Sequence, residues 1–214
     1  MIYSMRGGPW ALGGGLDLIS QRPRCFRIGP YQANCYILGC KKTSEGIVID
    51  PGADALRIVK EVTKTGLKIK YILITHGHYD HTGAAGDLKG IVKAPVWIHK
   101  LDSYGLGFPP DGALTDGQEI EVGTYRIKVI HTPGHSPGGV CLYAPGAVFT
   151  GDTLFVGGVG RTDLPGGSWP LMLRSIQTKL LTLPDETIVL PGHNYGATPT
   201  STIKNERLHN PFLK

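Results

Sequence analysis

The feature that most constrains this chain is an apolar segment that runs directly into a cluster of histidine and aspartate. Residues 69–75 form the most hydrophobic strand expected in the sequence, and His76, His78, Asp80 and His81 follow within six residues. Four such side chains could not converge from a helix. A tight loop after a strand can instead direct His76 and His78 to one metal ion, and Asp80 and His81 to another. The sequence therefore predicts a metal site at the end of a buried strand.

Three further candidate ligands, His135, Asp152 and His193, have the same setting. Each is flanked by glycine or proline, which allows a sharp backbone bend that presents the side chain. Each also follows an expected strand; these strands are 125–131, 147–150 and 187–190. Alone, any of the three would more often be an ordinary turn residue. Their joint occurrence with the first four ligands indicates one active centre.

The ligand types restrict the metal. Imidazole nitrogen and carboxylate oxygen suit zinc, iron and manganese, and a structural zinc site would normally use cysteine. The four cysteines form no C-x-x-C pair and are expected to be reduced core residues. Seven ligands exceed what one catalytic ion takes, so two ions that share a carboxylate, about 3.5–4 Å apart, are expected. We expect two divalent ions, zinc before iron or manganese.

Strands and helices follow one another along residues 24–214 without a linker, which predicts one domain in which helices cover the outer faces of sheets. Residues 1–23 are rich in glycine and are expected to be an extension, loosely ordered or lying along a sheet edge. Helix 54–66 is expected to bury Leu56, Val59 and Val62. The other expected elements are strands 34–38, 46–50, 95–98 and 140–143 and helices 82–88, 169–183 and 201–208.

Composition excludes several classes of function. The longest apolar runs of the 214 residues are too short to cross a membrane, and the first twenty residues lack a signal-like apolar stretch. We therefore expect a cytoplasmic protein with no membrane partner. The net charge of +5 is spread along the chain, which indicates a solvated basic surface and no nucleic-acid partner. The oligomeric state stays open, and a homodimer is compatible with the sequence.

The loop from His76 to His81 resembles the H-x-H-x-D-H signature of the metallo-β-lactamase superfamily, and His135, Asp152 and His193 match its later ligands in order. The resemblance covers about residues 24–214. It implies an α+β fold, a four-layer αββα sandwich with the metal site at one edge between the sheets. It also implies a division of the ligands: His76, His78 and His135 for the first metal, Asp80, His81 and His193 for the second, and Asp152 as the bridge. Asp80 and Asp152 are the expected catalytic carboxylates, which also limit the positive charge of the site.

Within this superfamily the chain looks like the short glyoxalase II-like hydrolases. The segments that carry this resemblance are Asn34-Cys35-Tyr36, Gly160-Arg161-Thr162-Asp163, Pro191-Gly192-His193 and the tail Asn210-Pro211-Phe212-Leu213. The resemblance implies hydrolysis of a small anionic S-acylglutathione thioester by a metal-bridging hydroxide, with Arg161 and Tyr195 contacting the substrate. The chain departs from glyoxalase II in two ways: Asp163 stands where that enzyme has a tyrosine, and the C-terminal helical domain of that enzyme is missing. Arg161 is equally expected to pair with Asp163 or with a substrate carboxylate.

A second class of enzyme competes with this interpretation. Persulfide dioxygenases share the fold and resemble the chain in Gly160–Asp163 and around Tyr195. They bind one non-haem iron, which here would use His76, His135 and Asp152 as a facial triad. The segments 156–159 and 164–167 look more like the short hydrolases, which favours hydrolysis. A nuclease or a non-catalytic binding module is less compatible, because no inserted domain is present and every ligand is intact.

Overall fold

The computed structural model describes residues 2–3 and 23–214. Most of the extension expected over residues 1–23 therefore lies outside the described residues. Within it, β1 (Ile2–Tyr3) pairs antiparallel with β2 (Arg24–Ile28) at the edge of a sheet. Among the described residues, no helix combines the length and the apolar character that crossing a membrane requires.

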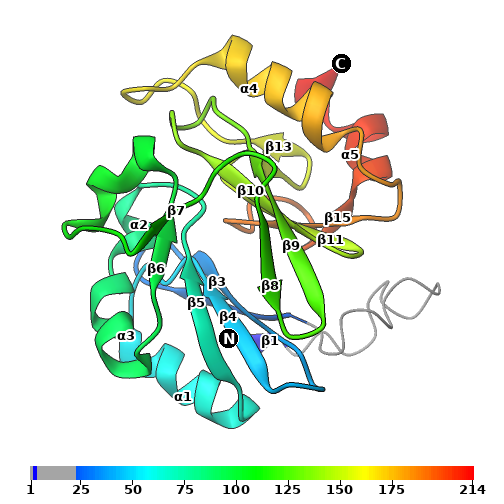
Figure 1. The fold of residues 1–214 in the computed structure, drawn as a ribbon. Helices are drawn as coiled ribbons and strands as arrows, with labels where there is room; N and C mark the ends of the chain where they lie inside the picture. Colours follow the sequence, from blue (N-terminus) through cyan, green and yellow to red (C-terminus); the bar gives the residue numbers. More distant parts are fainter. Residues whose placement is uncertain (1, 4–22) are drawn as a thin grey trace.

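Two sheets form the centre of the molecule (Figure 1). The first has the order β1-β2-β3-β4-β5-β6-β7 and becomes parallel from β4 onward. Its further strands are β3 (Ala33–Gly39), β4 (Glu45–Ile49), β5 (Lys68–Leu73), β6 (Val96–Ile98) and β7 (Gly112–Ala113). The second has the order β15-β14-β11-β10-β9-β8, with β11 and β14 parallel and its other neighbouring strands antiparallel.

The strands of the second sheet are β8 (Glu119–Val122), β9 (Tyr125–His131), β10 (Val140–Ala144), β11 (Ala147–Gly151), β14 (Ile188–Pro191) and β15 (Ser201–Thr202). A separate hairpin joins β12 (Leu154–Phe155) to β13 (Gly158–Val159). The alternation of buried and exposed residues in β8 and β9 shows that this part of the sheet has one face in the core and one face in solvent.

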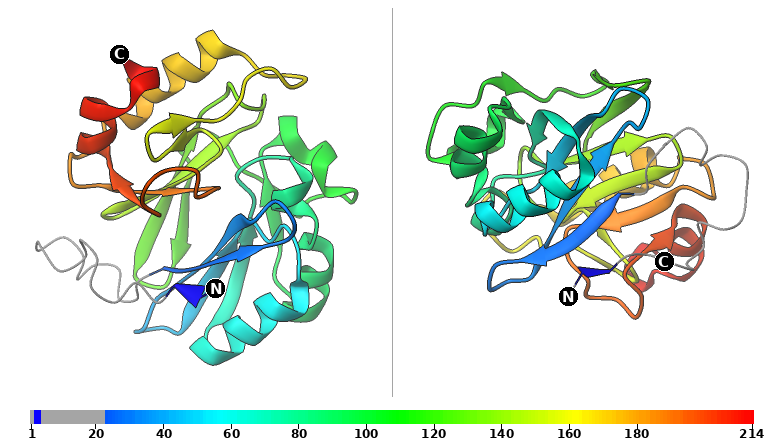
Figure 2. Two further views of the ribbon diagram at one scale, coloured as in Figure 1. Left: turned by 180° about the vertical axis from the view of Figure 1, so that it is seen from behind. Right: turned by 90° about the horizontal axis from the view of Figure 1, so that it is seen from below.

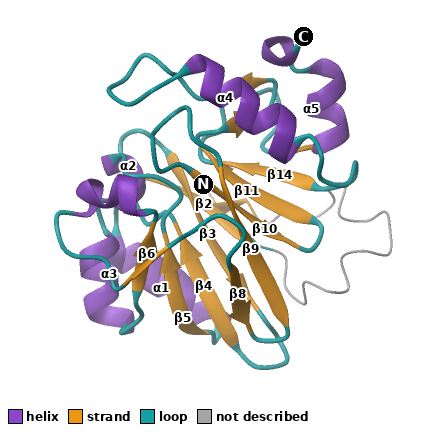
Figure 3. Ribbon diagram, turned by 45° about the horizontal axis from the view of Figure 1, so that its top comes forward, coloured by secondary structure: helices purple, strands orange, loops and turns teal. Residues whose placement is uncertain are grey.

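Helices cover both outer faces, and Figure 3 shows them on opposite sides of the sheets. Beside the first sheet lie α1 (Ala55–Thr65), α2 (Tyr79–Thr82), α3 (Ala85–Val92) and a 3₁₀ helix, η3 (Lys100–Leu106). Beside the second lie α4 (Trp169–Ser175), which continues as a π-helical turn (Ile176–Leu180), α5 (Ile203–His209) and a last 3₁₀ turn (Pro211–Leu213).

Three apolar clusters confirm the four-layer αββα arrangement. One lies between the sheets and contains Phe149, whose ring packs edge-on against Tyr36 at 5.1 Å. The second joins the first sheet to α1 and α3 through residues such as Ile58 and Leu88. The third joins the second sheet to α4 and α5 through residues such as Met172. The opposite sheet and the helices thus cover the faces of both sheets, except where β8 and β9 turn one face to solvent.

The buried face of α1 differs from the expected one. Leu56 is 77% exposed, whereas Ile58, Glu61 and Val62 are buried. Glu61 is buried because Lys64 approaches it at 2.6 Å and Arg24 at 3.7 Å. The prediction for Leu56 was wrong because the buried face is rotated about the helix axis: it is centred on Ile58, and Leu56 lies on the opposite side of the helix. The helix expected over 169–183 is also shorter, since it ends in the π-helical turn.

Four loops meet at one edge of the sandwich, as the views in Figure 2 help to follow. They follow β5, β9, β11 and β14, and they carry the predicted ligands. Because the rigid strands fix where these loops begin, the two sheets position the side chains that meet there.

Candidate metal centre

Of the first four ligands, two lie in a loop and two lie in a helical turn. His76 and His78 lie in the loop after β5, as expected. Asp80 and His81 lie in the single turn of α2, for which His78 is the N-cap residue. The helix expected over 82–88 is therefore divided into α2 and α3. A loop followed by one helical turn directs the two pairs of side chains differently, which an undivided helix could not do.

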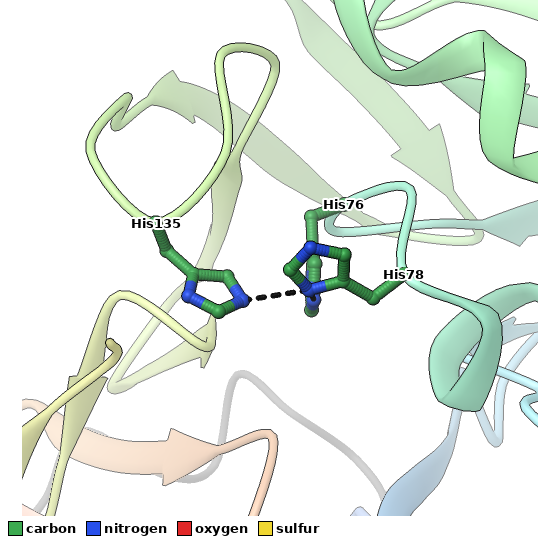
Figure 4. A group of neighbouring side chains, drawn as sticks. All are labelled: His76, His78 and His135. Carbon is green, nitrogen blue, oxygen red and sulfur yellow. Dashed lines mark hydrogen bonds between the residues drawn. The ribbon is translucent and has the colours of Figure 1, made fainter. Parts of the chain in front are cut away.

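The first group of ligands is His76, His78 and His135 (Figure 4). His78 Nδ1 lies 3.1 Å from His76 Nε2 and 2.8 Å from His135 Nε2. Nitrogen atoms that bind one zinc ion at about 2.0–2.1 Å in a tetrahedron are about 3.3 Å apart. The three imidazoles therefore have nearly the spacing that one shared ion requires.

The second group is Asp80, His81 and His193. His193 Nε2 lies 3.2 Å from Asp80 Oδ2 and 3.3 Å from His81 Nε2. His81 Nε2 lies 3.7 Å from the same Asp80 oxygen. These spacings again match the edges of a coordination polyhedron around one cation.

Asp152 lies between the two groups. Its Oδ2 is 3.7 Å from His135 Nε2 and 3.6 Å from His193 Nε2, and its Oδ1 is 3.5 Å from His81 Nε2. Oδ1 is buried without a hydrogen-bond partner among the described residues. Burying a carboxylate oxygen without a hydrogen-bond donor costs free energy, and a cation bound to that oxygen would remove the cost. The donor set therefore fits metal ions, and the structure brings all seven predicted ligands together.

The protonation of the ligands reflects their burial and their neighbours. Burial and the positive charge of His81 lower the pKa of His76 well below its usual value, which keeps its ring neutral for metal binding. Burial alone would raise the pKa of Asp80, but the hydrogen bond from His193 and nearby histidines lower it to about 2. Burial alone would lower the pKa of His81, but Asp152 and Asp50 raise it to about 9. Metal binding at His81 must therefore release a proton.

Residues outside the ligand set orient the ligands, and sequence reasoning missed them. Asp50 Oδ2 lies 3.0 Å from His81 Nδ1, and Asp50 accepts hydrogen bonds from the backbone N–H and the hydroxyl of Thr75, both at 2.7 Å. The carbonyl oxygen of Arg161 lies 2.8 Å from His135 Nδ1. Such contacts fix the ring orientation of a metal-binding histidine. The position of Asp50 at a strand end before proline and glycine is the signal that would have found it.

The two predicted substrate contacts line a cavity of about 320 Å³ that opens beside the metal ligands. The Nε and one terminal nitrogen of Arg161 each donate to Asp163 at 2.8 Å, and this hydrogen bond lowers the pKa of Asp163 to about 2. The ring of Tyr195 stacks on His193 at 4.9 Å and meets Phe155 edge-on at 5.1 Å. Arg161 is thus paired with Asp163, one of the two partners expected for it.

Comparison with known proteins places this arrangement in a family. Residues 28–193 match the family model described as the metallo-beta-lactamase superfamily. The chain belongs to the metallo-beta-lactamase superfamily. A relative from Bacillus subtilis (strain 168), the probable metallo-hydrolase YqgX, is 37% identical over 89% of this chain and 96% of its own length. Hydroxyacylglutathione hydrolase GloC of Haemophilus influenzae is 34% identical over 86% of this chain and 93% of its own length.

Solved structures of the superfamily have the same fold. The BLEG-1 B3 metallo-beta-lactamase is 37% identical, with a TM-score of 0.81 over 90% of this chain and 100% of its own. ETHE1 from Myxococcus xanthus is 31% identical, with a TM-score of 0.81 over 89% and 84% of the two chains. TTHA1623, solved in a di-iron-bound form, is 37% identical, with a TM-score of 0.76 over 88% and 99%. This member of the superfamily therefore has the metallo-hydrolase fold and a divalent-metal site.

Proposed function

We propose that the chain is a metal-dependent thioester hydrolase of the S-acylglutathione type that uses two divalent ions. One observation carries the proposal: two ligand groups lie side by side, joined by Asp152, and Asp152 and His135 line one cavity. Asp80 and Asp152 serve as the carboxylate ligands of the catalytic centre. The relative named hydroxyacylglutathione hydrolase supports the choice of substrate class. We propose zinc as the metal. Iron is the alternative, because TTHA1623 was solved in a di-iron-bound form.

The residues around the cavity suit a reaction with a stable leaving group. When bound, divalent ions supply an activated water and a Lewis acid for the substrate carbonyl. Beside metal ligands, the described residues that line the cavity include the titratable side chains of Arg161 and Tyr195 but no further histidine or carboxylate. A thiolate leaves without a strong general acid, so a thioester fits this set. Arg161 and Tyr195 then contact the substrate at the cavity wall.

Persulfide dioxygenase activity is the second candidate, because His76, His135 and Asp152 lie close enough to form a facial triad. His135 Nε2 is 3.7 Å from Asp152 Oδ2, and His76 groups with Asp152 and His81. One iron on these three side chains would leave Asp80 and His193 without a role, although they lie 3.2 Å apart. The second ligand group therefore favours the hydrolase.

Metal content separates the two candidates. The protein purified under metal-replete conditions should contain close to two transition-metal ions per chain by elemental analysis, because two complete ligand groups are present. It should cleave S-lactoylglutathione and consume no oxygen with glutathione persulfide. One retained ion, dominated by iron, together with oxygen uptake would assign the dioxygenase. A β-lactam belongs in the same assay panel, because BLEG-1 is named a B3 metallo-beta-lactamase.

Arg161 provides a test of substrate recognition. Arg161→Ala should raise KM for S-lactoylglutathione about two- to fivefold and leave kcat nearly unchanged, because an exposed and already paired arginine gives a small, uniform contribution to binding. Steady-state kinetics with an uncharged thioester of the same acyl group is the control, and its KM should not change. Equal weakening of both substrates would mean that Arg161 supports the loop through Asp163 and does not contact a carboxylate.

A further inference from the structure

A buried carboxylate outside the ligand set connects the two loops that form the three-histidine group. Asp102 lies in η3, between β6 and β7, and is completely buried. It accepts the backbone N–H of Gly77 at 2.9 Å, and Gly77 lies between His76 and His78. It also accepts the hydroxyl of Ser136 at 2.6 Å and the backbone N–H of Gly138 at 2.6 Å, in the turn that carries His135.

The two loops contact η3 so closely that larger residues would not fit. A Cβ atom on Gly77 would come within 2.5 Å of the Asp102 carbonyl oxygen. A Cβ atom on Gly138 would come within 2.6 Å of the Asp102 Oδ1. On the other side, the hydroxyl of Thr82 donates to the carbonyl of Gly105 at 2.7 Å and attaches α2 to the same helix. Asp102 is thus surrounded by the backbone that positions the ligands.

Both side-chain oxygens of Asp102 act as hydrogen-bond acceptors. Three donors converge on them, and Oδ1 and Oδ2 each accept one backbone N–H. An asparagine would have the same shape but would point an amide N–H₂ group at one of these donors. The energetic cost is large in a buried position, because an unmatched donor there has no water to bind. The pair of loops could then no longer keep its spacing.

We propose that Asp102 is the positioning residue of the three-histidine ligand group: it holds the loop of His76 and His78 at a fixed distance from His135. The inference rests on the two-ion centre of the proposed function. It concerns one group only, because His81 of the other group is oriented by Asp50. Loss of Asp102 should therefore weaken one ion selectively.

The test is a cobalt titration of the metal-free protein against a competing chelator, followed by visible absorption and elemental analysis. Asp102→Asn should bind one ion as the wild type does and the other about 10–100-fold more weakly, the usual effect of losing an outer contact of a metal site. Ser136→Ala, which removes one of the three donors, should have the same effect to a smaller degree. Asp50→Asn should weaken the other ion more strongly, with a different change in the cobalt spectrum, because Asp50 contacts His81 directly and reaches His76 only through Thr75.

Asp111→Asn is the matched control, because Asp111 also accepts a backbone N–H, that of Val96 at 2.8 Å, and Lys89 at 2.7 Å, but touches no ligand loop. It should bind both ions like the wild type. The inference is overturned if Asp102→Asn and Ser136→Ala keep both affinities, or if both ions weaken equally while the metal-free protein loses thermal stability. A wild type that binds one ion would contradict the two-ion proposal instead, and Asp102 would then be tested on that ion.

Discussion

Replacing Asp152 with alanine should reduce kcat for thioester cleavage by at least about a thousandfold, the scale of losing a principal electrostatic contribution to catalysis. The side chain contacts both ligand groups, with His135 at 3.7 Å and His193 at 3.6 Å from one oxygen and His81 at 3.5 Å from the other. Its removal would leave two positively charged centres without the carboxylate between them. Steady-state kinetics together with metal content per chain measures the effect.

Tyr79→Phe is the control for this variant, because Tyr79 lies among the ligands that follow β5 but its side chain is 76% exposed. Its activity should stay within about twofold of the wild type, as surface substitutions usually leave structure and stability nearly unchanged. Full activity in Asp152→Ala would show that the ligand assignment is wrong. Loss of activity in both variants would indicate that the ligand loops tolerate no substitution, and the loss in Asp152→Ala would then not support a bridging role.

The ligands could be predicted from the sequence because their signals are local. His76 and His78 follow an apolar strand directly, and Asp152 and His193 each follow a glycine at a strand end. Most strands were predicted for the same reason: β9 was expected over 125–131 and has those bounds. A short apolar stretch with turn residues at its ends has few alternatives, and the strands then bring the loops together.

Asp50 has a local signal at its strand end, but the partners of the residues that support the ligands could not be predicted, because each contact joins residues far apart in the chain. Asp102 meets Gly138 across 36 positions, and Asp50 meets His81 across 31. Nothing in the segment around Asp102 distinguishes a buried carboxylate from an exposed one until the partner loops are placed. The face of α1 was mistaken for a related reason: the side of the helix that is buried depends on how it packs against the first sheet, and that side carries Ile58 and Val62 together with Glu61, which pairs with Lys64 and Arg24.

Gly192→Ala should remove most of the activity, by at least about a hundredfold, through a purely steric effect on the metal ligands. A Cβ atom at this position would overlap Asp152 Oδ1 and would come within 2.9 Å of His81 Cε1. The backbone cannot move away easily, because the Gly192 N–H donates to the carbonyl of Gly151 at 2.8 Å and its own carbonyl accepts the N–H of Asn34 at 2.7 Å. Forcing atoms into a packed site costs about 1–3 kcal/mol and displaces its neighbours.

The measurement for Gly192→Ala is metal content and kcat, with thermal unfolding as a separate readout. Gly90→Ala is the matched control, since a Cβ atom on Gly90 would meet nothing within 4 Å and the residue lies in α3. That variant should keep both ions and full activity and should gain about 0.5–1 kcal/mol of stability from the helix preference of alanine. If Gly192→Ala also keeps two ions and full activity, the position of Asp152 between the two ligand groups is not essential. The bridging role proposed for its carboxylate would then have to be abandoned.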